Sequence, residues 1–157
     1  MPLSIREITP TDHPALKDFI YGAIFVPPNT SPPARDIIFN PDVFIYIDDF
    51  GCRHGDHGVV AEIDDNIVGM AWTRIILAYG HIDEFTPELA VSVLPQYRNQ
   101  GIGEALMLHL FNLLRENNFK QTSLAVQKAN PATQFYLRLG YEILRENEEE
   151  WIMVKQL

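Results

Sequence analysis

Residues 89–107 constrain the fold more than any other part of the chain, because they join an apolar strand to an amphipathic helix through a short loop. The loop holds Arg98, Gly101 and Gly103. The free N–H groups in the first turn of a helix, together with the positive end of the helix dipole, attract an anion. Glycine lets phosphates approach those N–H groups, and arginine adds a permanent positive charge. The segment therefore predicts a diphosphate site.

Two common nucleotide-binding patterns do not fit this loop. A Walker P-loop is longer and ends in Gly-Lys-Ser/Thr, which is absent here. The Gly-x-Gly-x-x-Gly pattern of dinucleotide-binding folds also fails, because Leu106 stands where its third glycine belongs. Neither class of nucleotide-binding protein is therefore expected.

The loop instead resembles motif A of the GNAT superfamily of N-acetyltransferases, Arg/Gln-x-x-Gly-x-Gly/Ala, which here reads Arg98-Asn-Gln-Gly-Ile-Gly103. Residues 130–142, which include Asn130, Tyr136 and Gly140, resemble motif B of the same family. The two motifs stand in the expected order, separated by one helix and one strand. The resemblance implies a mixed α/β fold of the GNAT-like acyl-CoA N-acyltransferase type. In that fold a central, mostly antiparallel sheet carries helices on both faces.

The resemblance also implies a reaction, in which an acetyl group moves from acetyl-CoA to a primary amine by direct transfer in a ternary complex. The backbone of Val91 and Val93 is expected to pair with the pantetheine arm as an added β-strand does. Asn130 is expected near the pantetheine, and it is also a good helix N-cap. The residues expected to hold the diphosphate through their backbone are Arg98, Asn99, Gln100, Gly101, Ile102, Gly103 and Glu104.

Two side chains are the expected catalytic residues. By the resemblance, the hydroxyl of Tyr136 protonates the departing thiolate, a gain on the order of 10²-fold at most, because a thiol of pKa near 8.5 leaves readily. The alternative for Tyr136 is a core tyrosine with a satisfied hydroxyl. Glu88 is the best-placed base for the amine, and an exposed acid at the start of a strand is its alternative. The rival bases lie in the preceding loop and are His81, Asp83 and Glu84.

Two further groups of residues have a plain structural alternative. Cys52, His54 and His57 lack a fourth ligand and the usual zinc spacings, so they are expected to form a surface turn and no metal is expected. Phe44, Trp72 and Tyr79 are aromatic residues that fit either an acceptor pocket or the core. Neither group changes the predicted reaction.

Composition narrows the partners and the compartment. The formal net charge of −9, from 12 Lys plus Arg against 21 Asp plus Glu, argues against nucleic acid. No apolar run reaches the ~18 residues that span a bilayer, and no secretion signal is visible, so a cytoplasmic protein is expected. The expected partner is a small-molecule or peptide amine, and a homodimer stays open. A non-catalytic acyl-CoA-binding module is the alternative function, although it needs neither Tyr136 nor a nearby carboxylate.

The hydrophobic pattern predicts one domain over residues 1–157. Apolar residues at steps of three and four predict a core-facing helix over 102–117, with Ile102, Ala105, Leu106, Leu110, Leu113 and Leu114 inward. Residues 44–47 fit a strand or a helical turn, and the five acids between 142 and 150 suggest a solvated turn. The other predicted helices begin near residue 12, span 33–39, and start at Pro131. The predicted strands are 3–8, 59–63, 67–76, 88–94, 122–126, 141–144 and 151–154.

Overall fold

A computed structural model describes residues 2–157, and its seven strands form one sheet in the order β1-β2-β3-β4-β5-β7-β6. All neighbouring strands are antiparallel except β4 and β5, which confirms the expected, mostly antiparallel sheet. The strands are β1 (Leu3–Glu7), β2 (His57–Ile63), β3 (Asn66–Arg74), β4 (Glu88–Val93), β5 (Gln121–Gln127), β6 (Glu142–Glu146) and β7 (Glu150–Gln156).

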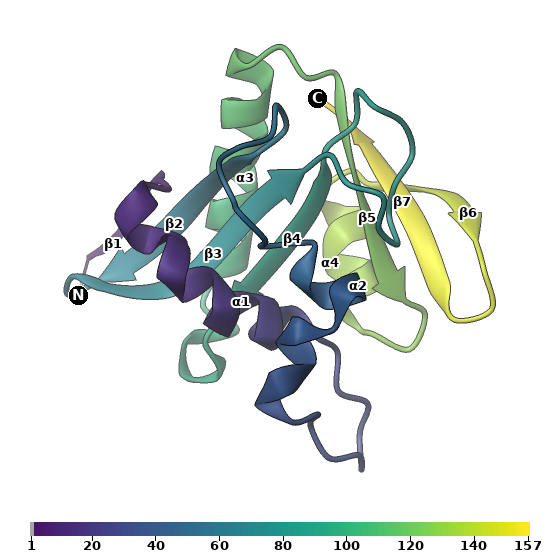
Figure 1. Cartoon of the computed structure of the whole chain (residues 1–157), viewed down its shortest axis with the longest axis horizontal. Helices are drawn as coiled ribbons and strands as arrows, with labels where there is room; N and C mark the ends of the chain where they lie inside the picture. The colour runs from purple at the N-terminus through teal and green to yellow at the C-terminus, as the bar shows by residue number, and fades with distance from the viewer. Residues whose placement is uncertain (1) are drawn as a thin grey trace.

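Helices cover both faces of this sheet, as Figure 1 shows for α1 and α3. The first face carries a 3-10 helix at Pro10–Ala15, α1 (Leu16–Ala23), a 3-10 helix at Arg35–Phe39, and α2 (Pro41–Phe44). The second face carries α3 (Ile102–Glu116) and α4 (Ala132–Arg138). A short 3-10 helix, Pro95–Tyr97, lies between β4 and α3. The helices therefore lie as the resemblance implied.

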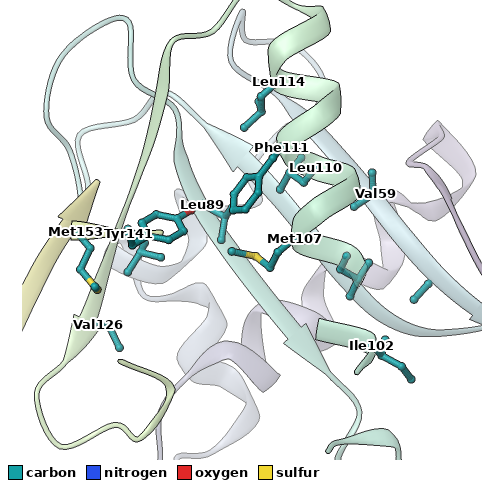
Figure 2. Close-up of a cluster of buried hydrophobic side chains, with 14 of the residues drawn as sticks. Val59, Leu89, Ile102, Met107, Leu110, Phe111, Leu114, Val126, Tyr141 and Met153 are labelled. Carbon is teal, nitrogen blue, oxygen red and sulfur yellow. The ribbon is translucent and has the colours of Figure 1, made fainter. Parts of the chain in front are cut away.

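The predicted apolar stripe of α3 lies on the core of the second face (Figure 2). Leu106, Leu110 and Leu114 are each 0% exposed, at the four-residue spacing that keeps side chains on one side of a helix. Ala105 and Leu113 lie at the margin of the stripe and are only half-buried. A separate core on the first face joins α1 to the other side of the sheet through Leu16, Phe19, Ile20, Met70 and Trp72.

Several predicted boundaries differ from the structure. Residues 44–47 complete a helical turn that begins with α2, so they are not a strand. Strand β2 begins at His57, two residues earlier than predicted, and β3 ends at Arg74, two residues earlier. Helix α4 begins at Ala132 instead of Pro131. These segments are short, and their ends are fixed by contacts with distant residues that local periodicity does not report.

Candidate active site

A pocket of about 340 Å³ lies where β4 and β5 separate, and it is called the central pocket below. Its walls come from α1 and the segment after it, residues 42–46, β4, β5, α4 and the β6–β7 turn. The polar side chains that line it are Asp42, Tyr46, Tyr79, Glu88, Gln127, Asn130, Tyr136, Glu149 and Glu150. Predicted residues that lie far apart in the sequence, Glu88, Asn130 and Tyr136, are thus brought to one pocket.

The pocket exists because β4 and β5 pair at one end only. Their register has a single pair, Glu88 with Ser123, beside which Ser123 N–H donates to Pro87 O at 3.0 Å. Figure 1 shows the two strands diverging from there toward their carboxyl ends. On its other edge β4 pairs with β3 along its whole length. The divergence leaves one edge of β4 without a neighbouring strand.

The backbone of Val91 and Val93 lies on that open edge. Leu94 N–H donates to Val68 O, on the β3 side, at 2.9 Å. Because N–H and C=O groups of alternate residues point to the same side of a strand, those of Val91 and Val93 point toward β5. Arg98 Nε donates to Val93 O at 2.9 Å. The Val93 N–H and both backbone groups of Val91 are therefore available to an extended ligand.

Glu88 is the buried acid of the central pocket, with 3% of its surface exposed. Tyr46 donates its O–H to Oε2 of Glu88, and Oε1 has no hydrogen-bond partner among residues 2–157. Burial raises the pKa of Glu88 to about 7, while the hydrogen bond from Tyr46 and the backbone of Gly80 oppose the rise. The exposed alternative for Glu88 is therefore wrong. Its carboxyl group can gain or lose a proton near neutral pH.

Tyr46 is a pocket residue that the sequence did not reveal. Strand β3 holds its segment, because Trp72 Nε1 donates to Tyr46 O at 2.9 Å and Arg74 donates to Ile45 O at 3.0 Å and Asp48 O at 2.6 Å. Burial and the adjacent Glu88 raise the pKa of Tyr46 far above its ordinary value, so its hydroxyl is a neutral donor. No local pattern marks this residue, since its contacts join segments 26 and 42 residues apart in the chain.

Tyr136 projects from α4 into the central pocket. The ring centroid of Tyr136 lies 5.4 Å from that of Phe135 and 5.7 Å from that of Tyr141. Its hydroxyl makes no hydrogen bond within the described part of the chain, and burial raises its pKa to about 12. A tyrosine in this state is a neutral O–H that is free to donate to a ligand.

Asn130 begins the turn that leads into α4. Its side-chain Oδ1 accepts the Ala132 N–H at 2.9 Å, which is the expected capping contact, and the residue also lines the central pocket. Gly140 closes this helix with φ +98°, a conformation that favours glycine. Asn130 and Gly140 thus mark the two ends of α4, the helix that carries Tyr136.

The loop of residues 98–104 has the geometry of an anion cradle. Helix α3 begins at Ile102, and its first internal backbone bond runs from Ala105 N–H to Gly101 O at 3.1 Å. The N–H groups of residues 101–104 therefore have no helical partner. Gly101 adopts φ +81°, and a Cβ built there meets no atom within 4 Å, so the space beside this residue at the start of α3 is open. A diphosphate fits this arrangement.

The side chains of the loop point outward. Arg98, Asn99, Gln100 and Glu104 are exposed, and Asn99 adopts φ +61°, which asparagine tolerates. Apart from Nε, the nitrogens of the Arg98 guanidinium have no partner among residues 2–157, so they are available to an anion. Two further residues that were expected to hold the diphosphate, Ile102 and Gly103, lie in the first turn of α3, where Ile102 is buried.

The rival bases do not line the central pocket. His81 Nδ1 bonds with Ile76 O at 2.9 Å, Asp83 accepts the Phe85 N–H at 2.8 Å, and Glu84 is exposed. Of the candidate base residues, Glu88 is the one that the fold brings to this pocket.

The structure also shows which of the aromatic residues and possible metal ligands lie at the central pocket. Tyr79 lines the central pocket, whereas Phe44 and Trp72 pack in the core of the first face. The rings of His54 and His57 pack against Phe119, with centroids 5.2 and 5.6 Å away. No three His, Cys, Asp or Glu side chains within residues 2–157 form a group that could hold a metal ion. Over the same residues, every helix is too short or too polar to cross a membrane.

Known proteins resemble this chain in sequence and in fold. An N-alpha-acetyltransferase of Sulfurisphaera tokodaii is 31% identical over 114 residues, which cover 62% of this chain and 68% of the relative. The ribosomal-protein-S18-alanine N-acetyltransferase of Escherichia coli superimposes with a TM-score of 0.69 at 22% identity, covering 99% of this chain and 94% of that one. The PaiA N-acetyltransferase of Thermoplasma acidophilum, solved in complex with coenzyme A, gives 0.69 at 17% identity and covers all of both chains.

The sequence model of the acetyltransferase (GNAT) family matches residues 24–141, which contain both motifs and most of the central pocket. The chain is therefore an acetyltransferase of the GNAT family.

Proposed function

We propose that this protein transfers an acetyl group from acetyl-CoA to a primary amine, directly, within a complex that holds both substrates. One observation carries the proposal. The buried carboxyl group of Glu88, with one oxygen unpaired, shares the central pocket with the free hydroxyl of Tyr136. A base and an acid in one pocket are what an amine attack on a thioester requires.

Acetyl-CoA would supply the acetyl group as a thioester and the thiol that leaves. The N–H groups of residues 101–104 and the Arg98 guanidinium would hold its diphosphate at the positive end of α3. The open backbone groups of Val91 and Val93 would align the pantetheine arm along β4. Positioning of this kind supplies a large part of the rate in a two-substrate reaction.

Glu88 is proposed to receive the proton of the amine, directly or through water. An amine of pKa near 10.4 arrives as an ammonium ion at neutral pH, and an ammonium ion has no lone pair for attack. With a pKa of about 7, Glu88 is ionised above neutrality and can accept that proton. The O–H of Tyr46 holds the carboxyl group in place through Oε2.

Tyr136 is proposed to donate its proton to the departing thiolate. The raised pKa of about 12 keeps the hydroxyl protonated over the whole working range of pH. Support for the acceptor class comes from the relative at 31% identity, whose name assigns it an α-amino group as acceptor. We therefore infer that an α-amine, as at a peptide N-terminus, is among the primary amines to be tested first.

The test is to incubate the protein with acetyl-CoA and a panel of primary amines, and to follow coenzyme A release with a thiol reagent. Amine-dependent release that rises with pH through about 7, and is lost on Glu88→Gln, supports the proposal. Glu148→Gln, in the neighbouring turn and outside the pocket, is the matched control. Tight coenzyme A binding without release for any amine would instead identify a non-catalytic acyl-CoA-binding module.

A further inference from the structure

The central pocket is lined by four carboxyl groups and by no cation. Asp42, Glu88, Glu149 and Glu150 line it, and none of its described lining residues is Lys, Arg or His. Glu88 is buried, whereas Asp42 and Glu149 are exposed and Glu150 is half-buried. The carboxyl groups therefore lie at two depths. Glu88 forms the floor of the pocket, and Asp42, Glu149 and Glu150 form its rim.

One carboxyl group at the rim, that of Glu150, affects the titration of residues deeper in the pocket. Burial is the main cause of the raised pKa of Glu88, Tyr46 and Tyr79, and the negative charge of Glu150 raises all three further. A negative charge such as that of Glu150 beside the buried carboxyl group of Glu88 is unfavourable unless a cation joins them. The structure therefore holds a negative potential that the protein itself does not neutralise.

The nearby cations are engaged elsewhere. Lys128 pairs with Glu146 at 2.8 Å and lies over the Trp151 ring at 4.6 Å. Arg145, on the edge strand β6, donates to His81 O at 2.7 Å. Neither residue lines the central pocket. The charge of the rim is therefore left open to a cationic group of a ligand.

An independent observation points to a ligand at the floor. Glu88 is 97% buried by its 3% exposure, and Oε1 has no partner in the described chain. A buried carboxylate oxygen without a donor is costly, and an ammonium or amine N–H removes that cost. The reacting nitrogen accounts for this one oxygen. The rim still lacks a cation, because Glu150 accepts a hydrogen bond from the neutral Asn147 amide at 3.3 Å and Asp42 bonds with the neutral Tyr79 hydroxyl.

We propose that the acceptor carries a second positively charged group besides the amine that is acetylated. This inference rests on the proposed acetyl transfer and names its substrate class. The reacting amine lies against Glu88, and the second cation lies between Glu149, Glu150 and Asp42 at the rim. The apolar side chains of Ile24 and Phe25, which also line the pocket, cover the carbon chain between the two charges.

Two sources share this chemistry, an aliphatic diamine and a peptide whose N-terminal residue is followed by a basic one. The experiment measures kcat/KM at saturating acetyl-CoA for two matched pairs of acceptors. Cadaverine is compared with pentylamine, and alanyl-lysine amide is compared with alanyl-norleucine amide. The members of each pair have the same number of carbon atoms, and the charged member carries one further primary amine. Because that amine is also a second possible acceptor, an advantage of up to about twofold is statistical and is discounted. The arm with the larger remaining advantage identifies the source.

We expect the dicationic member of one pair to exceed its neutral partner about tenfold, since two partly exposed ion pairs give roughly 1.4 kcal/mol. The advantage should fall to about twofold in the double variant E149Q/E150Q and persist in Glu148→Gln, which removes a neighbouring charge outside the pocket. It should also shrink between low and high salt, because ions screen partly exposed charges.

Equal use of the charged and neutral acceptors in both pairs overturns this inference and leaves acetyl transfer intact. An advantage that E149Q/E150Q does not reduce also overturns it, because the rim is then not its cause. Failure of the wild-type protein to release coenzyme A with any amine is a different result. It refutes the proposed function, and the inference falls with it.

Discussion

The carboxyl group of Glu88 links activity to the stability of the fold. Its pKa is raised from 4.5 to about 7 in the folded state, so between those values the folded protein binds more protons than the unfolded chain. The stabilisation is complete below pH 4.5 and is lost as pH rises through 7. We expect Glu88→Gln to remove this pH-dependent loss, which is roughly 3–4 kcal/mol.

Urea denaturation of both proteins between pH 4 and pH 8 measures this effect. As pH rises, the free energy of unfolding of Glu88→Gln should increase relative to that of the wild type. The free energy of unfolding of Glu148→Gln should change with pH as that of the wild type does. Parallel curves for Glu88→Gln and wild type would show that the carboxyl group titrates normally in the folded protein.

Tyr136 offers a second test at the scale of one atom. Tyr136→Phe keeps the ring and its packing against Phe135 and Tyr141 and removes only the hydroxyl. Because that hydroxyl bonds to no described residue, its removal should leave the melting temperature within about 2 °C. We expect kcat and kcat/KM to fall together, by about 10- to 100-fold, with acetyl-CoA affinity unchanged. Unchanged kcat would make Tyr136 a packing residue.

The loop before α3 is the element that we propose to bind the cofactor. A side chain at Gly101 would enter the open space at the start of α3, where the diphosphate is proposed to lie. Gly101→Val should raise the coenzyme A Kd at least about tenfold, because each lost charge-assisted bond is worth about 1.5–3 kcal/mol. Isothermal titration of the folded variant measures the affinity.

Valine at Gly101 also strains the backbone, because φ is +81° there. Gly101→Asn separates the two causes, since asparagine tolerates this conformation and still places a side chain in the same open space. Weak binding in both variants supports the cradle. Weak binding in the valine variant alone assigns the effect to strain, and normal affinity in both removes the diphosphate from this loop.

The sequence predicted best those elements whose conformation is determined by residues close to them in the chain. The stripe of α3, the glycine loop and the cap at Asn130 are fixed by neighbouring residues, and the structure agrees with them closely. The conformation of residues 44–47 is not determined by neighbouring residues in this way. Their turn is held by Trp72 and Arg74, and only the folded chain shows that Tyr46 meets Glu88.

At the scale of the whole molecule, the sheet divides the site between two cores. The proposed cofactor wall, with α3 and α4, packs on one face, and the wall formed by α1 and residues 42–46 belongs to the other. Sequence motifs marked the first wall, because the ligand contacts proposed there are made by backbone groups with fixed spacing. The second wall is built from aromatic and acidic side chains whose position depends on pairing across the sheet.

A buried ion pair holds the second wall in place, so it tests this division. Arg74 Nε donates to Asp56 at 2.9 Å, their side chains are 1% and 0% exposed, and the same guanidinium holds Ile45 O and Asp48 O. Asp56→Ala leaves a buried charge unpaired, which should lower the free energy of unfolding by about 3–5 kcal/mol. We also expect it to loosen Tyr46.

The consequences should differ between the two walls. In Asp56→Ala, measured where the protein is still folded, kcat should fall because Tyr46 no longer holds Glu88. The Kd of coenzyme A should stay within about twofold, since the α3 loop packs on the opposite face. Titration calorimetry and steady-state kinetics on the same preparation measure both. Equal losses of affinity and turnover would mean that the sheet does not insulate one wall from the other.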